Sequence, residues 1–346
     1  MERSEWKSRV ENYLQDKFGS DIQVTYWKEL SGGACQDNIA LDYKLNSRTE
    51  SLVLRTDKAA SLLSSLPKKS EFQVAETIYK SGALTPKPIL YESNTEVLGN
   101  PFYLMERITG NANSRYLIKD NSLNQYRKKG MAQDLARNLA KIHTNTIENS
   151  HFDKDTLVLL GETNNELYIK SSIDKLKETI NSLGEPHPAI AIAINWVESV
   201  IDQFKPTDIC LVHGDFRTGN FMVTPEGLTG ILDYEFAHWG DRHEDIGWLC
   251  MRDWRFGKVM KEVGGFADRK EFYDAYENAS GVAVDPKKVC FWEIIGNLRW
   301  ATGSIQQAER HLSGKDKGIE LAAIGRRTCE MEFEMLNLIE KLEKLN

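Results

Sequence analysis

Long apolar runs are missing from this 346-residue sequence. Its most apolar stretch, Ala189 to Trp196, is far shorter than the roughly 20 residues that a membrane-spanning helix needs. The first residues are charged throughout and lack the apolar centre of a secretory signal peptide. The sequence therefore predicts a soluble protein that has no membrane partner.

Cysteine is scarce, scattered and odd in number. The five residues are Cys35, Cys210, Cys250, Cys290 and Cys329. None belongs to a C-x-x-C pair, which disfavours both a disulfide framework and a zinc site of the usual spacing. The pattern fits reduced thiols, and a cytoplasmic location is the prediction.

An excess of positive charge is also absent, because 44 Lys and Arg face 51 Asp and Glu for a net charge of −7. Binding to nucleic acid calls for a basic face, so no nucleic-acid partner is expected. The composition, 41% hydrophobic and 27% charged, is that of ordinary globular domains. A chain of this length suits two domains or lobes.

The most informative stretch is HGDFRTGNFM, from His213 to Met222. Short apolar runs on both sides of it predict strands joined by a polar loop. Asn220 follows Asp215 by five positions, and Asp233 comes thirteen positions later at the end of another apolar run. The turn signal ProGluGly lies between them and predicts a hairpin that brings Asn220 and Asp233 side by side.

Phosphoryl transfer from a nucleotide requires such a set of side chains. One carboxylate orients and deprotonates the attacking hydroxyl, while an Asn and an Asp hold magnesium against the phosphates. The protein-kinase catalytic loop has the same H-x-D-x-x-x-x-N spacing, followed by a metal-binding Asp. A HisGlyAsp turn that merely caps a hairpin is the structural alternative, and the complete set in this order disfavours it.

These motifs resemble the aminoglycoside phosphotransferase family, the small-molecule kinases with a protein-kinase-like fold. The resemblance implies an α+β, bilobal architecture with a small β-rich N-terminal lobe and a larger, mainly helical C-terminal lobe. It implies Asp215 as the catalytic base, Asn220 and Asp233 as metal ligands, and ATP and Mg²⁺ as cofactors. We expect the nucleotide-binding lobe at residues 1–107 and the catalytic, acceptor-binding lobe at residues 108–346.

The N-terminal part of the sequence fits a nucleotide-binding lobe. Alternating runs predict three antiparallel strands at 22–27, 38–43 and 51–55, after a helix at 5–18. A GlyGly pair between two strands can be simply a tight turn, which is the commoner meaning of such a pair alone. In this place the pair resembles the family's phosphate-covering loop, which implies phosphate contacts from Gly32, Gly33 and Ala34. The family often has Ser where Cys35 stands, and the effect of Cys there stays open.

Arg55 ends the third predicted strand, where kinases place a lysine that pairs with phosphates and with a glutamate on the next helix. Glu71, sixteen residues later on a predicted helix, supplies that carboxylate. A surface ion pair is the alternative, and the effect of Arg in place of Lys stays open. In kinase-like folds the strand near 101–108 becomes the hinge, so Met105, Glu106 and Ile108 are expected to contact adenine.

The remainder of the sequence predicts a helix within 121–149 that ends at His143, and further helices at 167–183, 189–204, 271–279, 286–312 and 317–345. We expect His143 to be a core residue. His238, Asp241 and His243 lack zinc-type spacing. By the family likeness Asp245 would brace the catalytic loop, and Glu235 and Asp241 are expected to line the acceptor pocket.

The predicted activity is ATP- and Mg-dependent phosphorylation of a small-molecule hydroxyl. The family includes aminoglycoside, choline, homoserine and hydroxyacyl-CoA kinases. A cationic acceptor would need an acidic site, for which Glu235, Asp241, Glu244 and Glu293 are available, whereas the basic and apolar stretch at 298–311 favours a non-antibiotic acceptor such as a hydroxyacyl-CoA. A silent, nucleotide-binding scaffold is the alternative. The sequence leaves open ATP against GTP and the oligomeric state.

Overall fold

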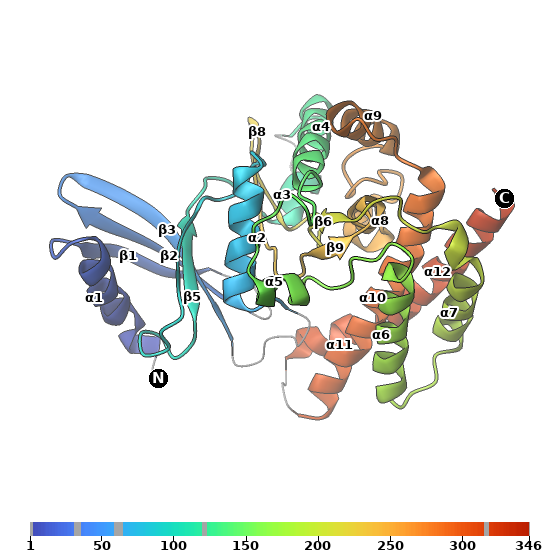
Figure 1. Ribbon diagram of the computed structural model, residues 1–346, viewed down its shortest axis with the longest axis horizontal. Helices are drawn as coiled ribbons and strands as arrows, with labels where there is room; N and C mark the ends of the chain where they lie inside the picture. Colours follow the sequence, from blue (N-terminus) through green and yellow to red (C-terminus); the bar gives the residue numbers. More distant parts are fainter. Residues whose placement is uncertain (1–2, 31–35, 59–64, 120–122, 315–317, 346) are drawn as a thin grey trace. The chain divides into compact units, whose positions relative to one another are not determined.

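The computed structural model of the chain describes residues 3–30, 36–58, 65–119, 123–314 and 318–345 (Figure 1). A five-stranded sheet occupies the N-terminal part and helices dominate the C-terminal part, so the predicted α+β class is confirmed. The chain folds into two compact units. The first comprises residues 1–112, 150–160 and 220–237, and the second comprises residues 113–149, 161–219 and 238–346. The division into lobes at residue 107 stays a prediction.

The sheet of the first unit has the strand order β1-β2-β3-β5-β4. Each of its neighbouring strands is antiparallel, and the three predicted strands are present in longer form. The five strands are β1 (Gln23–Leu30), β2 (Gln36–Leu45), β3 (Arg48–Asp57), β4 (Pro88–Glu92) and β5 (Phe102–Glu106). Register pairs Arg55 of β3 with Asn38 of β2 and with Tyr103 of β5, which places Arg55 in the middle of the sheet.

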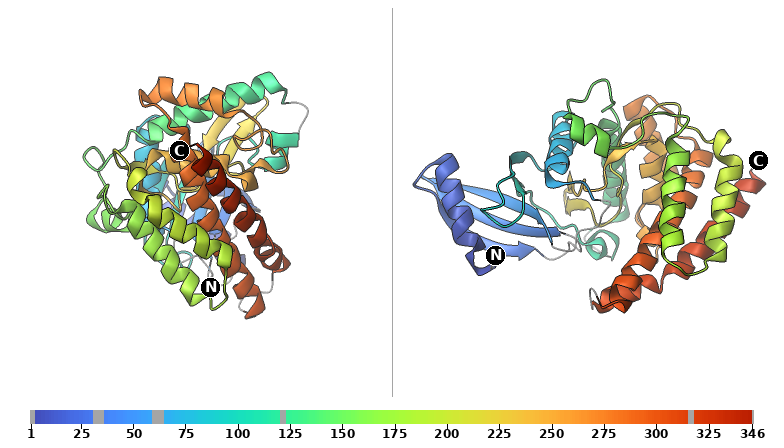
Figure 2. Two further views of the ribbon diagram at one scale, coloured as in Figure 1. Left: turned by 90° about the vertical axis from the view of Figure 1, so that its right-hand side faces the viewer. Right: turned by 60° about the horizontal axis from the view of Figure 1, so that its bottom comes forward.

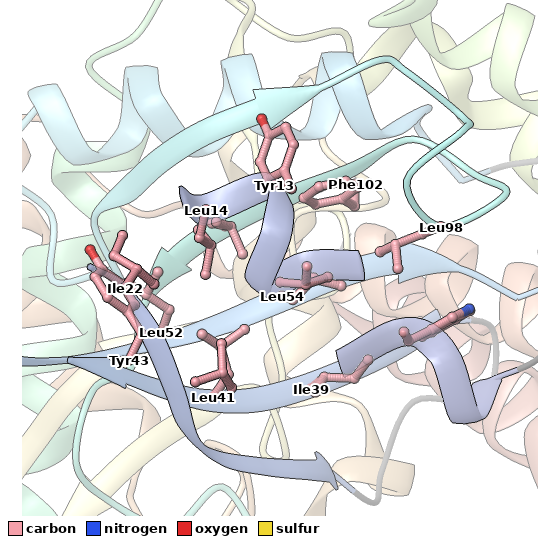
Figure 3. Close-up of a cluster of buried hydrophobic side chains, with 14 residues drawn as sticks. Tyr13, Leu14, Ile22, Ile39, Leu41, Tyr43, Leu52, Leu54, Leu98 and Phe102 are labelled. Carbon is pink, nitrogen blue, oxygen red and sulfur yellow. The ribbon is translucent and has the colours of Figure 1, made fainter. Parts of the chain in front are cut away.

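Helix α1 (Trp6–Phe18) covers one face of this sheet, as its apolar periodicity predicts. Figure 3 shows Tyr13 and Leu14 of α1 above Leu41 and Leu54 of the strands, in a cluster that also includes Phe102. The first unit also contains helices α2 (Lys68–Lys80) and α5 (Lys154–Leu159) and the hairpin of β7 (Phe221–Thr224) and β8 (Gly227–Ile231).

The second unit consists mainly of helices. Its longest helix, α10, contacts α6, α8, α11 and α12, and α12 also contacts α7 (Figure 2). The helices are α3 (Ser114–Lys119), α4 (Gln125–Ile142), α6 (Tyr168–Ser182), α7 (Pro188–Val200), α8 (Arg242–Cys250), α9 (Arg269–Ser280), α10 (Pro286–Leu312), α11 (Ile319–Gly325) and α12 (Thr328–Lys344). Strands β6 (Cys210–Val212) and β9 (His238–Gly240) form a small antiparallel ribbon beside them.

Two helix predictions need correction. The helix predicted within 121–149 begins later than Asn121, because Asn124 caps α4 by accepting a hydrogen bond from the Arg127 N–H, and its predicted end at His143 is confirmed. The helix predicted at 317–345 is split into α11 and α12. Gly325 at the end of α11 lies so close to Ala308 of α10 that a Cβ would clash, so the two helices pack tightly at this position. In the described residues, none of the helices combines the length and apolarity needed to span a bilayer.

Candidate active site

The predicted site residues fall in both compact units, and each unit is described by itself. Asn220, Asp233, Arg55 and Glu71 belong to the first unit, whereas Asp215 belongs to the second. Gly32, Gly33 and Ala34, together with Cys35, lie outside the described residues.

In the first unit, the β7–β8 hairpin places Asn220 and Asp233 at its open end. Phe221 pairs with Ile231, and the N–H of Leu232 donates to the carbonyl of Asn220 at 2.9 Å. The predicted hairpin is therefore confirmed. Asp233 has a φ of +76°, in the left-handed region that Asp adopts more readily than most side chains. Such strain clusters at ligand-binding and catalytic positions.

Arg55 is the centre of a buried ion network in this unit. Its guanidinium lies 2.6 Å from Glu71 and pairs with the carboxylate of Asp233. Burial lowers the pKa of Arg55, but Asp233 and Glu71 outweigh that effect and the net pKa is raised well above its usual value. The predicted Arg55–Glu71 pair is thus a buried contact and differs from a surface ion pair.

Lys68 is a second buried cation that the sequence reasoning missed. Its ammonium lies 2.6 Å from Glu71 and 3.0 Å from Asp57, and its side chain is fully buried. Glu71 also accepts a hydrogen bond from the Tyr103 hydroxyl at 3.0 Å. The contact between Lys68 and Glu71 could have been predicted from the sequence, because residues three apart on a helix share a face.

Glu235 extends the polar region beside Asp233. It accepts hydrogen bonds from Gln36 at 2.6 Å and from Ser65 at 3.1 Å, and it is 8% exposed. Burial, followed by the charge of Asp233, raises the pKa of Glu235 to about 7. The expected role of Glu235 in the acceptor pocket stays a prediction.

The donor atoms of Asn220 and Asp233 suit magnesium. Both offer oxygen, and Mg²⁺ is usually held by one or two carboxylates together with substrate phosphates. The described residues contain no group of three His, Cys, Asp or Glu side chains arranged to hold a metal. Asp233 faces a guanidinium in this structure, so a cation would compete with Arg55 for it.

The hinge residues lie at the end of β5. Glu106 already donates its N–H to the carbonyl of Lys87 at 2.8 Å, whereas the N–H of Ile108 has no backbone partner among the described residues. The Ile108 side chain packs against Gly230 of β8, where a Cβ would clash with it. Ile108 thus has a donor available for a ligand, and the adenine contacts stay a prediction.

In the second unit, Asp245 of α8 holds the catalytic loop through its backbone. One carboxylate oxygen accepts from the N–H of His213 at 2.7 Å, and the other accepts from the N–H of Gly214 at 2.9 Å. His143 also lies 3.0 Å from Asp245 and 2.7 Å from the Tyr276 hydroxyl, and burial lowers its pKa. The bracing expected of Asp245 and the core position expected of His143 are confirmed.

The Asp215 side chain is 10% exposed and has two polar neighbours that the sequence reasoning did not assign. Arg217 places Nε at 2.9 and 3.0 Å from the two carboxylate oxygens. Trp248 donates its indole N–H to Oδ1 at 2.8 Å. Because Arg217 comes two residues after Asp215, their proximity was open to prediction, whereas Trp248 comes from a separate helix.

Asp241, expected in the acceptor pocket, is 2% exposed and caps α8. It accepts from the His243 N–H at 2.9 Å and lies 2.7 Å from His243 Nδ1. Two surface hollows of the second unit, of about 280 and 450 Å³, are lined by residues of α4 and α9 and of α6 and α7 respectively. Neither contains a predicted site residue, so they add nothing to this site.

Comparison of the sequence with models of known protein families gives one match that covers the site. The model of the phosphotransferase enzyme family (APH) matches residues 27–282, about three-quarters of the sequence. The chain belongs to this phosphotransferase family. Its resemblance to the aminoglycoside phosphotransferases is confirmed, and all the residues proposed for the site lie inside the matched segment.

Solved structures support the same fold for this phosphotransferase-family chain. A candidate aminoglycoside phosphotransferase of Ralstonia eutropha has a TM-score of 0.74 at 18% identity, with 96% of this chain and 98% of that chain covered. A choline kinase of Streptococcus pneumoniae has a TM-score of 0.58 at 18% identity, with 93% and 98% covered. These likenesses establish the kinase-like fold.

Curated relatives include acyl-CoA dehydrogenase family member 11 of Rattus norvegicus, 27% identical over 253 residues. Acyl-CoA dehydrogenase family member 10 of Mus musculus is 25% identical over 216 residues. The matches cover 70% and 60% of this chain but only 30% and 19% of those proteins. This phosphotransferase-family chain thus corresponds to a minor part of each relative's length.

Proposed function

We propose that this chain is an ATP- and Mg-dependent kinase that phosphorylates the hydroxyl group of a small molecule. The observation that carries the proposal is the set of Asp215, Asn220 and Asp233, ordered and spaced as in kinases, on a loop and a hairpin of a kinase-like fold. Membership of the phosphotransferase family supports it.

The residues of the first unit would bind the nucleotide. Asn220 and Asp233 would hold magnesium, which neutralises charge on the phosphates when it is bound. Arg55, oriented by Glu71, would donate to phosphate oxygens through its forked N–H groups. Lys68 pairs with Glu71 as well, so Glu71 keeps a cationic partner while Arg55 contacts the phosphates.

The residues of the second unit would bind the acceptor hydroxyl and accept its proton. Asp215 would accept the hydroxyl proton as the oxygen attacks the terminal phosphorus, and the bond from that phosphorus to the bridging oxygen breaks. Asp245 fixes the loop backbone, and Trp248 fixes the carboxylate. Holding the nucleophile in the right geometry accounts for much of the rate enhancement in such reactions.

A hydroxyacyl-CoA is the acceptor that we favour within this class. The relatives in which a segment like this one covers a minor part of the length are named for acyl-CoA dehydrogenases. A kinase segment attached to an acyl-CoA dehydrogenase would let one protein both phosphorylate and dehydrogenate the same acyl chain.

The second candidate is a scaffold that binds nucleotide without catalysis. The Arg55–Asp233 ion pair is the observation that favours it, because this pair occupies the carboxylate that would bind metal. The presence of all three residues Asp215, Asn220 and Asp233 favours the kinase.

Turnover separates these candidates. The full-length protein would be incubated with ATP and Mg²⁺ and a panel containing 3-hydroxybutyryl-CoA, choline, homoserine and an aminoglycoside, and phosphorylated products would be detected by mass spectrometry. A kinase yields a product with at least one hydroxyl compound. Binding of ATP with no product from hydroxyl compounds of any class would support the scaffold.

A further inference from the structure

Three tryptophan side chains form a cluster in the second unit, and one of them contacts Asp215. The Trp254 ring lies 5.6 Å from the Trp248 ring and 5.3 Å from the Trp300 ring, centroid to centroid. Trp248 is the same residue that donates to Asp215. Indole faces provide apolar area and also attract cations, so such a cluster beside a carboxylate is in principle a good site for an ammonium group.

The face of Trp254 is already occupied by Arg217. The guanidinium carbon of Arg217 lies 4.6 Å from the Trp254 ring centroid, well within cation–π range. The Nε atom of the same guanidinium contacts both oxygens of Asp215. Arg217 thus supplies, from within the protein, the cation that both the aromatic face and the carboxylate would otherwise attract.

The loop backbone leaves room for this placement. Gly219 has a φ of +118°, which favours glycine, and a Cβ at this position would lie 2.8 Å from Nη1 of Arg217. Thr218 anchors the loop by donating its hydroxyl to the carbonyl of Gly264 at 2.8 Å. The Arg217 side chain is 28% exposed, and its Nη2 group has no hydrogen-bond partner within the described residues. That group is available to an oxygen atom of a ligand.

Three other buried carboxylates of this unit are also matched by cations. Glu244 pairs with Arg299 and His238, and the effect of these partners lowers its pKa despite its burial. Asp253 pairs with Arg327 at 2.9 Å and accepts from the Trp300 indole.

Glu293 lies 2.8 Å from Arg269 and 3.4 Å from Arg255. Of the acidic residues considered for a cationic acceptor, Glu244 and Glu293 therefore have arginine partners, and Asp241 is engaged by His243. These buried carboxylates are therefore paired with side chains of the protein itself.

We propose that Arg217 is a specificity-determining residue, which places the protein's own cation on the Trp254 face and so excludes acceptors that carry a positive charge. The site takes hydroxyl compounds that are uncharged or anionic, and Nη2 of Arg217 donates to an oxygen beside the reacting hydroxyl. This inference rests on the proposed function only in that Asp215 marks where the acceptor hydroxyl binds.

The test uses two alcohols of the same shape, choline and its uncharged carbon isostere 3,3-dimethylbutan-1-ol. Dissociation constants would be measured by ligand-observed NMR for the full-length wild type, Arg217→Gln and Arg217→Lys. We expect the wild type to bind the uncharged alcohol at least about tenfold more tightly than choline, a ratio equivalent to about 1.4 kcal/mol. Arg217→Gln should shift the ratio at least about tenfold toward choline, and Arg217→Lys should retain the wild-type preference.

Arg137→Gln is the matched control, because it removes one arginine charge from a half-exposed side chain of α4 that pairs with Asp134. It should leave the ratio unchanged. Choline binding that is the same in the wild type and in Arg217→Gln, including undetectable binding to both, would overturn the inference. An equal loss of affinity for both alcohols in Arg217→Gln would overturn it too, since that result would mean that Arg217 only positions Asp215. The measurement needs no phosphoryl transfer, so an inactive enzyme would refute the proposed function and leave this result standing.

Discussion

The two compact units arrange their charged site residues in opposite ways. In the first unit, Arg55 and Lys68 are buried among three carboxylates, so the ion pairs are part of the core. In the second unit, Asp245 holds the backbone of the loop, and Asp215 has partners that are part-exposed side chains. The comparison teaches that removing a charge should affect mainly stability and metal binding in the first unit, and mainly turnover and selectivity in the second.

The largest expected effect is on turnover, from Asp215→Asn. The amide keeps the size of the side chain and an oxygen for Trp248, but it cannot accept the hydroxyl proton. We expect turnover with a verified acceptor to fall about 10²–10⁴-fold, the usual range for a positioned general base. ATP affinity, measured by calorimetry, should stay the same, because the proposed nucleotide ligands belong to the first unit. The exposed pair partner Asp134 provides the control Asp134→Asn, and turnover equal to that control would remove Asp215 from catalysis.

Glu71→Gln tests the buried network of the first unit. Loss of this carboxylate leaves Arg55 and Lys68 buried with one fewer anion, which should lower the free energy of unfolding by about 3–5 kcal/mol. Glu76→Gln on the same helix is the control, because its pair with Lys80 is exposed and should contribute about 0–1 kcal/mol. Urea unfolding of both variants measures the difference. Equal midpoints would mean that the network adds no stability.

Asp233→Asn should weaken the binding of Mg-nucleotide at least about tenfold, since even supporting residues of metal sites contribute 10–100-fold. Calorimetric titration with Mg-ADP measures the affinity, and the same titration with EDTA is the control. The difference between wild type and variant should vanish when magnesium is removed. A difference that persists in EDTA would assign Asp233 to nucleotide contacts instead of metal.

The smallest effect concerns the pH dependence of stability and tests the second unit through His143. Burial lowers the pKa of His143 in the folded protein, so below the unfolded pKa of about 6.5 the unfolded chain binds more protons. Stability should therefore fall as the pH decreases from 7 to 5, by up to about 2 kcal/mol from this group. His143→Gln should reduce the slope, whereas His151→Gln, at an exposed position, should retain it. Parallel pH profiles for wild type and His143→Gln would contradict the expectation.

Much of the architecture was predictable because it depends on local patterns. The helix at 286–312 has proline at its first position and Asp285 as its cap, and the structure has the same bounds. The β7–β8 hairpin follows from a turn signal between two short apolar runs. The break between α11 and α12 was missed because the apolar pattern of 317–345 continues across it and no proline marks it.

The sequence alone determined the order and spacing of Asp215, Asn220 and Asp233, since a loop and a hairpin of fixed length need only local interactions. The tertiary structure alone decided which charges meet. Arg55 and Asp233 are 178 residues apart, and Arg217 reaches Trp254 from a different element. The physical reason is that burial of apolar faces dominates the packing of strands and helices, so the polar groups on these elements pair with whichever partners that packing brings within reach.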